Sequence, residues 1–199
     1  MDRSDVEVIE RSTPYQGHFR MDVYRLRHRL FAGGVSGEIR REVFVRNRAV
    51  AVTLYDPERD MVGLVEQFRI GPYAAGRNPW MVELVAGVVE EGEDPIDVAR
   101  RETREEAGVE ILDLFPLYEY FVSPGGTTES VLIYCARFDS RGVGGTHGLP
   151  HEDEDIRVFV QPLDQTLAEL AAGRIDNAIT IIGLQYLALN RAPIRARWA

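Results

Sequence analysis

Alternating polar and apolar residues characterise the first part of the chain. From residue 18 to residue 47 this alternation runs on either side of a glycine-rich stretch, AGGVSG, at residues 32–37. Strict alternation is typical of a half-buried strand, and a glycine-rich turn joins two such strands into a ribbon. A ribbon of this kind buries too little apolar surface to be stable alone. We therefore expect residues 1–47 to form an antiparallel β-ribbon that packs on the remaining chain or on a second subunit.

Longer apolar runs follow and predict the strands of a larger sheet, at residues 48–56, 61–70, 81–90, 117–123, 130–138 and 156–163. Helical periodicity occurs at residues 92–108, 164–173 and 177–190. The segment between the last two strands is rich in glycine and acidic residues and has no periodicity. Strands mixed with a few helices predict a layered α/β domain with a mixed sheet for residues 48–199.

Charge and composition narrow the classes of partner. The chain of 199 residues has a net charge of −9, with 23 basic residues, all of them arginine, against 32 acidic ones. Such a balance gives no general attraction to nucleic acid or to an anionic membrane. The longest apolar stretch is too short to span a bilayer, and the first residues lack the apolar core of a signal peptide. We expect a cytoplasmic protein whose single cysteine, Cys135, is a packed thiol in a strand.

The helix predicted at residues 92–108 has sequence signals at both ends. Asp94 is a good N-cap, Pro95 suits the first helical position, and Gly108 suits the left-handed residue that ends a helix. Between them an apolar stripe at intervals of three and four is expected to pack on the sheet. Its members are Ile96, Ala99, Thr103 and Ala107.

Three glutamates are clustered in this helix and are expected on a separate face. They are Glu102, Glu105 and Glu106. Like charges at this spacing repel one another, and Arg101 can pair with Glu105 but leaves the other two without a local partner. Two interpretations follow: a solvated acidic face, or a site for a hard divalent cation, which binds oxygen ligands.

The spacing around the helix distinguishes these interpretations. From Gly87 the sequence reads G-x5-E-x7-R-E-T-x-E-E-x-G, ending at Gly108. This resembles the Nudix box, G-x5-E-x7-R-E-U-x-E-E-x-G-U, in which U is aliphatic. Seven matched positions have a chance probability of roughly one in 10^8 per starting point, if each is matched about once in fifteen. Thr103 departs from the aliphatic position, but its methyl group can still pack inward.

The resemblance implies a fold and a set of roles. The fold would be a Nudix-type α/β/α sandwich with a mixed sheet, and the activity hydrolysis of a nucleoside diphosphate linked to another group. The metal ligands would be Glu102, Glu106 and the backbone carbonyl of Ala86, with a catalytic role for Glu105. Four residues of the box would have structural roles: Gly87, Glu93, Arg101 and Gly108.

Further segments resemble one branch of this family, the bacterial ADP-ribose pyrophosphatases. They include RHRLFAGGVSGEIRREVF, LVEQFRI, SPGGTTE, GTHGLPHEDEDIRV and GRIDNA, and Pro124 lies sixteen positions beyond Gly108, where that branch has a proline. The resemblance implies that an acidic loop covers the site, with Glu154 as a further metal ligand and Glu152 as general base. Asp153 and Asp155 are the alternative bases.

The same branch implies the substrate and its contacts. ADP-ribose would be hydrolysed to AMP and ribose 5-phosphate with Mg²⁺, for which Mn²⁺ can substitute. Arg69 would bind a phosphate, while Arg41 and Glu129 would bind the adenosine half in a homodimer that exchanges its N-terminal ribbons. Two alternatives are a pyrophosphatase for other nucleotide sugars such as GDP-mannose, and a non-catalytic nucleotide-sensing Nudix domain.

Overall fold

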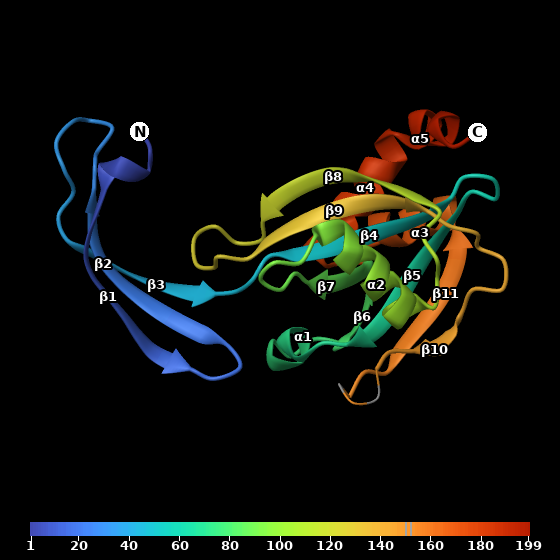
Figure 1. The fold of residues 1–199 in the computed structure, drawn as a ribbon, viewed down its shortest axis with the longest axis horizontal. Helices are drawn as coiled ribbons and strands as arrows, with labels where there is room; N and C mark the ends of the chain where they lie inside the picture. Colours follow the sequence, from blue (N-terminus) through green and yellow to red (C-terminus); the bar gives the residue numbers. More distant parts are fainter. Residues whose placement is uncertain (150, 152) are drawn as a thin grey trace. The chain divides into compact units, whose positions relative to one another are not determined.

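The computed structural model of the chain describes residues 1–149, 151 and 153–199, which form two compact units (Figure 1). The first unit comprises residues 1–47 and 121–130, and the second comprises residues 48–120 and 131–199. The first unit thus includes a short segment from the middle of the chain in addition to the N-terminal residues.

The first unit contains a three-stranded antiparallel sheet rather than a two-stranded ribbon. A 3-10 turn, η1 (Arg3–Asp5), precedes strands β1 (Val6–Gln16), β2 (Arg20–His28) and β3 (Ile39–Val45), which pair in that order. The alternation in the sequence indicated β2 and β3. It did not indicate β1, because every residue of that strand is exposed and its sequence carries no buried face.

The second unit contains the larger sheet, which is mixed as predicted. Its main strands run in the order β10-β11-β5-β4-β9-β8, and β4 pairs with β9 in parallel but with β5 antiparallel. The strands are β4 (Ala49–Asp56), β5 (Met61–Phe68), β8 (Asp113–Phe121), β9 (Ser130–Arg137), β10 (Gly145–His147) and β11 (Ile156–Pro162).

The apolar run at residues 81–90 is two strands, so the prediction of one strand was wrong. Strand β6 (Trp80–Glu83) pairs with β5, whereas β7 (Val85–Val88) pairs with β4. Leu84 lies between them, and its backbone N–H donates to the Thr180 hydroxyl (3.1 Å) instead of to a strand. Hydrophobic periodicity cannot reveal such a change of partner, because both halves are apolar.

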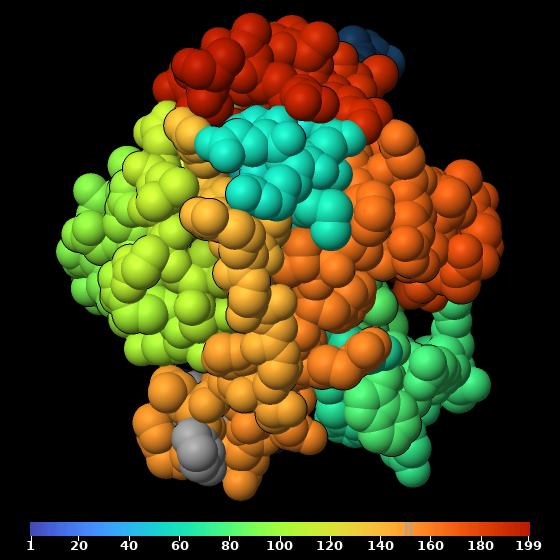
Figure 2. Space-filling view, turned by 90° about the vertical axis from the view of Figure 1, so that its right-hand side faces the viewer, coloured from blue at the N-terminus to red at the C-terminus, as the bar shows by residue number. Residues whose placement is uncertain are grey.

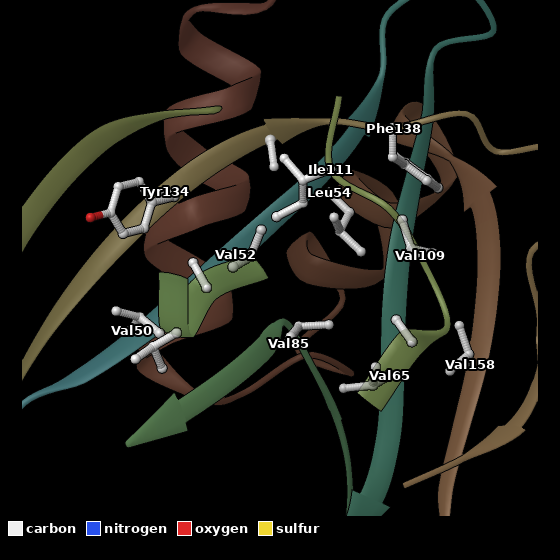
Figure 3. Packing of buried hydrophobic residues seen from close by; sticks show 14 of the residues in the cluster. Val50, Val52, Leu54, Val65, Val85, Val109, Ile111, Tyr134, Phe138 and Val158 are labelled. Atoms are coloured by element: carbon white, nitrogen blue, oxygen red, sulfur yellow. The ribbon is translucent and has the colours of Figure 1, made fainter. Parts of the chain in front are cut away.

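Helices cover both faces of this sheet. Three of them were predicted: α2 (Pro95–Ala107), α3 (Leu163–Ala171) and α4 (Ala178–Leu189). Alternate residues of β4, such as Val50 and Val52, share a buried cluster with Val98 of α2, part of which Figure 3 shows. Thr53, on the opposite face, lies against α4: a β-carbon added to Gly183 would be 2.5 Å from the Thr53 hydroxyl. The unit is therefore the expected α/β/α sandwich.

Two short helices, α1 (Ile70–Ala74) and α5 (Arg191–Arg197), were not predicted because each spans fewer than three turns. Arg191 of α5 donates from Nε to Asp60 (3.0 Å) in the turn between β4 and β5. Figure 2 shows this turn, in cyan, directly beneath the red C-terminal helices. No helix in the described part of the chain is long and apolar enough to cross a membrane.

Candidate active site

Helix α2 begins and ends where the sequence predicted. The Asp94 side chain accepts from the Ile96 backbone N–H (2.9 Å), Pro95 is the first residue, and Gly108 has a positive φ of 64°. Thr103 is fully buried, and its hydroxyl donates back to the Ala99 carbonyl (2.7 Å). A threonine at the aliphatic position of the box is thus accommodated without a lost hydrogen bond.

The inward face of α2 is not the one predicted from the apolar residues alone. Ile96 is 42% exposed, whereas Val98 and Glu106 are buried, with Glu106 only 4% exposed. The expectation that Glu106 lies on a separate acidic face was wrong. Glu106 is two helical turns beyond Ala99 and therefore points in the same direction, toward the sheet.

Strand β7 provides the surroundings of Glu106. The backbone N–H of Ala86 donates to the Glu106 carboxylate (3.1 Å). Burial raises the pKa of Glu106 to about 8; the Ala86 hydrogen bond and the charge of Arg69 act in the opposite direction, while the charges of Glu102 and Glu154 raise it further. A carboxyl group in this position has too little positive charge around it to ionise easily.

Glu102 lies beside Glu106 on the same helix and contacts the backbone of Gly87. A β-carbon added to Gly87 would be 2.1 Å from Cδ of Glu102. Burial raises the pKa of Glu102 to about 7; the neighbouring charge of Arg101 lowers it, and those of Glu105 and Glu154 raise it. Ala86 and Gly87 of β7 thus contact two glutamates of α2, of which Glu106 is buried and Glu102 half-buried.

Arg101 has more partners than the sequence suggested. Its guanidinium pairs with Glu102 (2.9 Å) as well as with Glu105 (3.0 Å), so the expectation that Glu102 lacks a local cation was wrong. It also approaches Glu93 at 3.8 Å, and Glu93 accepts from the Glu90 backbone N–H (2.9 Å). Arg101 therefore links the loop before α2 to the helix itself.

Arg69 follows the end of β5, and its charge acts on the buried Glu106. Its Nε donates to the carboxylate of Glu83 in β6 (2.8 Å). Burial raises the pKa of Glu83, while Arg69 lowers it. The charge of Arg69 also lowers the pKa of Glu106. The remaining donors of this guanidinium suit a phosphate group.

The acidic loop that carries Glu154 contacts helix α2. The backbone N–H of Gly148 donates to the carbonyl of Glu105 (3.3 Å), and that of Leu149 donates to the Glu154 carboxylate (3.0 Å). Asp153 has a positive φ of 57°. Glu152, expected as the general base, lies outside the described residues. Glu154 is thus connected through two residues to the helix that carries Glu102 and Glu106.

The donor set fits a divalent metal ion. Glu102 and Glu106 are carboxylates of raised pKa, and Glu154 contributes a third negative charge felt by both. Hard cations such as Mg²⁺ prefer oxygen ligands of this kind, and an ion would favour the ionised carboxylates against the burial that raises both pKa values. Among the residues that the structure describes, no three acidic, histidine or cysteine side chains already converge as a complete metal cage.

Comparison with known proteins shows the family and the fold of this chain. The NUDIX domain matches residues 45–180, which include strands β4 to β11 and helix α2. The chain belongs to the Nudix family. A crystal structure of an "ADP compounds hydrolase" aligns with 96% of this chain and 97% of its own, with a TM-score of 0.74 and 18% identity, which shows a shared fold.

Relatives within the Nudix family are similar over nearly the whole chain. An ADP-ribose pyrophosphatase of Escherichia coli K12 is 46% identical over 197 residues, which cover 99% of this chain and 94% of the relative. One from Haemophilus influenzae is 43% identical, with coverages of 98% and 92%. A GDP-mannose pyrophosphatase of Citrobacter koseri is 35% identical over 150 residues, 74% of this chain and 77% of the relative.

Two residues proposed for substrate binding lie in the first unit. Arg41 is in β3, exposed, and its Nη1 donates to the carbonyl of Arg40 (2.9 Å). Glu129 pairs with Arg46 at 3.6 Å. Both belong to the first compact unit, whereas the residues of the Nudix box belong to the second.

Sequence reasoning missed two residues near the Nudix box. Glu83 was read as part of an apolar strand, although an acidic residue inside such a run is itself a signal, since burying a carboxyl requires a partner. His147 was read as part of an irregular loop, but its ring packs against Gly108 at the end of α2. No pattern in the sequence indicates that contact, which joins segments far apart in the chain.

Proposed function

We propose that this chain hydrolyses the pyrophosphate of ADP-ribose to AMP and ribose 5-phosphate with the help of a divalent metal. The proposal rests on two glutamates of the Nudix-box helix, the buried Glu106 and the half-buried Glu102, which contact Ala86 and Gly87. Similarity over 99% of the chain to relatives named ADP-ribose pyrophosphatases supports this substrate.

The metal would be Mg²⁺, with Mn²⁺ able to substitute, held by Glu102, Glu106, Glu154 and the carbonyl of Ala86. Such an ion neutralises charge on the phosphates and lowers the pKa of bound water. Arg101 pairs with Glu102 and Glu105, so it would keep these carboxylates in place before the ion binds.

Proton transfer is assigned to the acidic loop. As the water oxygen bonds to phosphorus, a carboxylate must accept the proton from the water while the bond between phosphorus and the bridging oxygen breaks. We assign this role to Glu152, with Asp153 and Asp155 as alternatives. Glu105 lies at the junction of helix and loop, where its carbonyl accepts from Gly148, and its carboxylate would support the metal ligands.

Binding of the substrate phosphates is assigned to Arg69, which Glu83 orients through the hydrogen bond to Nε. Arg41 and Glu129 would bind the adenosine half across a homodimer in which the N-terminal segments are exchanged. The exposed β1 strand supports a second subunit, since a three-stranded sheet of this kind has little core of its own. Light scattering tests this: a stable and fully active monomer would contradict it.

The cytoplasm is the proposed location. The only cysteine, Cys135, is a buried thiol whose pKa burial raises to about 12, so no disulfide within the chain is possible. A protein without disulfides suits a reducing compartment. We propose no nucleic-acid or membrane partner, in line with the net charge of −9.

A panel of nucleotides tests the proposed activity. ADP-ribose, ADP-glucose, GDP-mannose, NADH and 8-oxo-dGTP are each incubated with Mg²⁺, and the nucleoside monophosphate formed is measured by chromatography. We expect ADP-ribose to have the highest kcat/KM. GDP-mannose is the second candidate, because a GDP-mannose pyrophosphatase is 35% identical over 74% of the chain. Turnover of none of these compounds would favour the nucleotide-sensing alternative.

A further inference from the structure

His147 ends strand β10, and its imidazole ring lies against the last turn of helix α2. A β-carbon added to Gly108 would be 2.4 Å from Cε1 of His147 and 2.9 Å from Nδ1. These distances are far shorter than a normal contact, so the ring occupies the space in which any other residue at Gly108 would have its side chain. Gly108 is also the left-handed residue that ends α2.

The ring is held from its own segment as well. Its Nε2 lies 3.1 Å from the Gly144 carbonyl, within hydrogen-bonding distance, and the side chain is half-buried. His147 also pairs with Ile156 across β10 and β11. The histidine is therefore fixed on one side by the strand and on the other by the end of the helix.

The residues that follow His147 extend this connection to the acidic loop. Gly148 donates to the Glu105 carbonyl, and Leu149 donates to the Glu154 carboxylate and accepts from the Glu154 N–H (3.4 Å). Gly148 has a φ of 102°, and a β-carbon there would be 2.7 Å from Cβ of Glu154. Gly148 thus contacts helix α2, and the next residue, Leu149, contacts Glu154.

We propose that His147 is a positioning residue, whose packing on Gly108 anchors the acidic loop to the end of α2 and so holds Glu154 toward Glu102 and Glu106. The role of Glu154 as a ligand rests on the proposed function, but the anchoring itself does not. His147 does not itself bind substrate or metal in this proposal; it acts through the backbone of Gly148 and Leu149.

Amide hydrogen exchange of the full chain, without metal, tests the anchoring directly. His147→Ala removes the ring, and we expect exchange at Gly148 and Leu149 to become about tenfold faster or more, because local opening governs exchange there. Amides inside α2 should keep their protection. His147→Phe retains a flat ring against Gly108 and should retain most of the protection. Thr146→Ala is the matched control, since Thr146 is exposed on the same strand.

Two results would overturn the proposal. One is unchanged exchange at Gly148 and Leu149 in His147→Ala. The other is equally faster exchange throughout α2, which would make His147 a residue of general stability. If His147→Ala does not fold, His147→Phe and His147→Gln are compared instead. Exchange at the Gly148 and Leu149 amides should be close to the wild-type rate in His147→Phe and faster in His147→Gln. The reverse order would contradict ring packing.

Kinetics then connect the anchoring to catalysis. We expect His147→Ala to lower kcat for ADP-ribose at least about tenfold with little change in KM, since a displacement of about 1 Å can cost up to about 100-fold. His147→Phe should recover most of the loss. Unchanged kcat in His147→Ala with faster exchange at Gly148 would contradict the link to Glu154. An inactive wild type would refute the proposed function instead, while the exchange experiment would still test the anchoring.

Discussion

The carboxylate of Glu102 lies directly against the backbone of Gly87. A β-carbon added to Gly87 would be 2.1 Å from Cδ of Glu102 and 2.2 Å from its Oε1. No real β-carbon makes such contacts, so the glutamate fills the space that a side chain on β7 would need. The first glycine of the box is thus required for the position of a glutamate in the following helix.

Gly87→Ala is predicted to displace the Glu102 carboxylate and to lower kcat about 100-fold, because a shift of about 1 Å is enough for a loss of this size. The added methyl group should also destabilise the fold by about 1–3 kcal/mol, the usual cost of overpacking. Steady-state kinetics and urea unfolding check both effects. Gly71→Ala is the control, since a β-carbon at Gly71 would meet nothing within 4 Å; equal losses in the two variants would contradict the explanation.

The raised pKa values of Glu102 and Glu106 predict how stability depends on pH without metal. The pKa of Glu106 is about 8 and that of Glu102 about 7, against an ordinary value of 4.5. The folded state therefore retains protons that the unfolded state has released, so the free energy of unfolding falls as the pH rises from about 4.5 to about 8. Urea unfolding with a chelator, at pH 5.5 and pH 8, measures this fall.

Glu106→Gln is the test variant for that pH dependence. It removes one of the two titrating groups, so its stability should change less between the two pH values. Added Mg²⁺ should stabilise the wild type more at pH 8 than at pH 5.5, because the ion binds the ionised carboxylates. Equal pH dependence of the wild type and Glu106→Gln would show that this carboxyl ionises normally in the folded protein.

Arg69→Ala is predicted to raise KM for ADP-ribose about tenfold or more, because it removes a guanidinium that can bind a phosphate through two hydrogen bonds. Arg69→Lys should recover only part of the loss, since lysine lacks the planar fork. The matched control is Arg77→Ala: this arginine is exposed in the same unit and pairs with Asp176. If Arg77→Ala and Arg69→Ala raise KM alike, the effect is one of general charge.

Glu152→Gln and Glu154→Gln separate the two roles assigned to the acidic loop. A general base contributes about 100-fold to 10^4-fold to turnover without holding the metal. We therefore expect Glu152→Gln to lower kcat strongly and to leave the Mg²⁺ concentration for half-maximal activity nearly unchanged. Glu154→Gln should raise that concentration. The opposite pattern would exchange their roles, and full activity of Glu152→Gln would direct attention to Asp153 and Asp155.

Much of the architecture could be predicted, because the residues at helix ends and the hydrophobic periodicity indicated the same elements. Helix α2 has its cap at Asp94 and its left-handed end at Gly108, and both were readable from residue type. The mixed sheet followed from apolar runs of strand length. Strand β1 could not be predicted, because none of its side chains is buried and no periodicity results.

The candidate site was only partly readable, because its contacts join distant segments. The resemblance to the Nudix box indicated Glu102 and Glu106 as ligands, but it could not indicate that Glu106 is buried and accepts from Ala86. Two contacts of the site arise where a strand lies close to helix α2: Gly87 with Glu102, and Gly108 with His147. The sequence shows that both positions are glycine, but only the fold shows which side chain occupies the space beside each of them.

Product analysis of ADP-ribose hydrolysis by wild type and Glu106→Gln at pH 8 tests metal-dependent hydrolysis at this site most directly. We expect the wild type with Mg²⁺ to yield equal amounts of AMP and ribose 5-phosphate, and a chelator to stop the reaction. Glu106→Gln should lose nearly all turnover while its circular dichroism spectrum stays unchanged. Near-normal turnover by folded Glu106→Gln, or by chelated wild type, would contradict a metal-dependent reaction at this site.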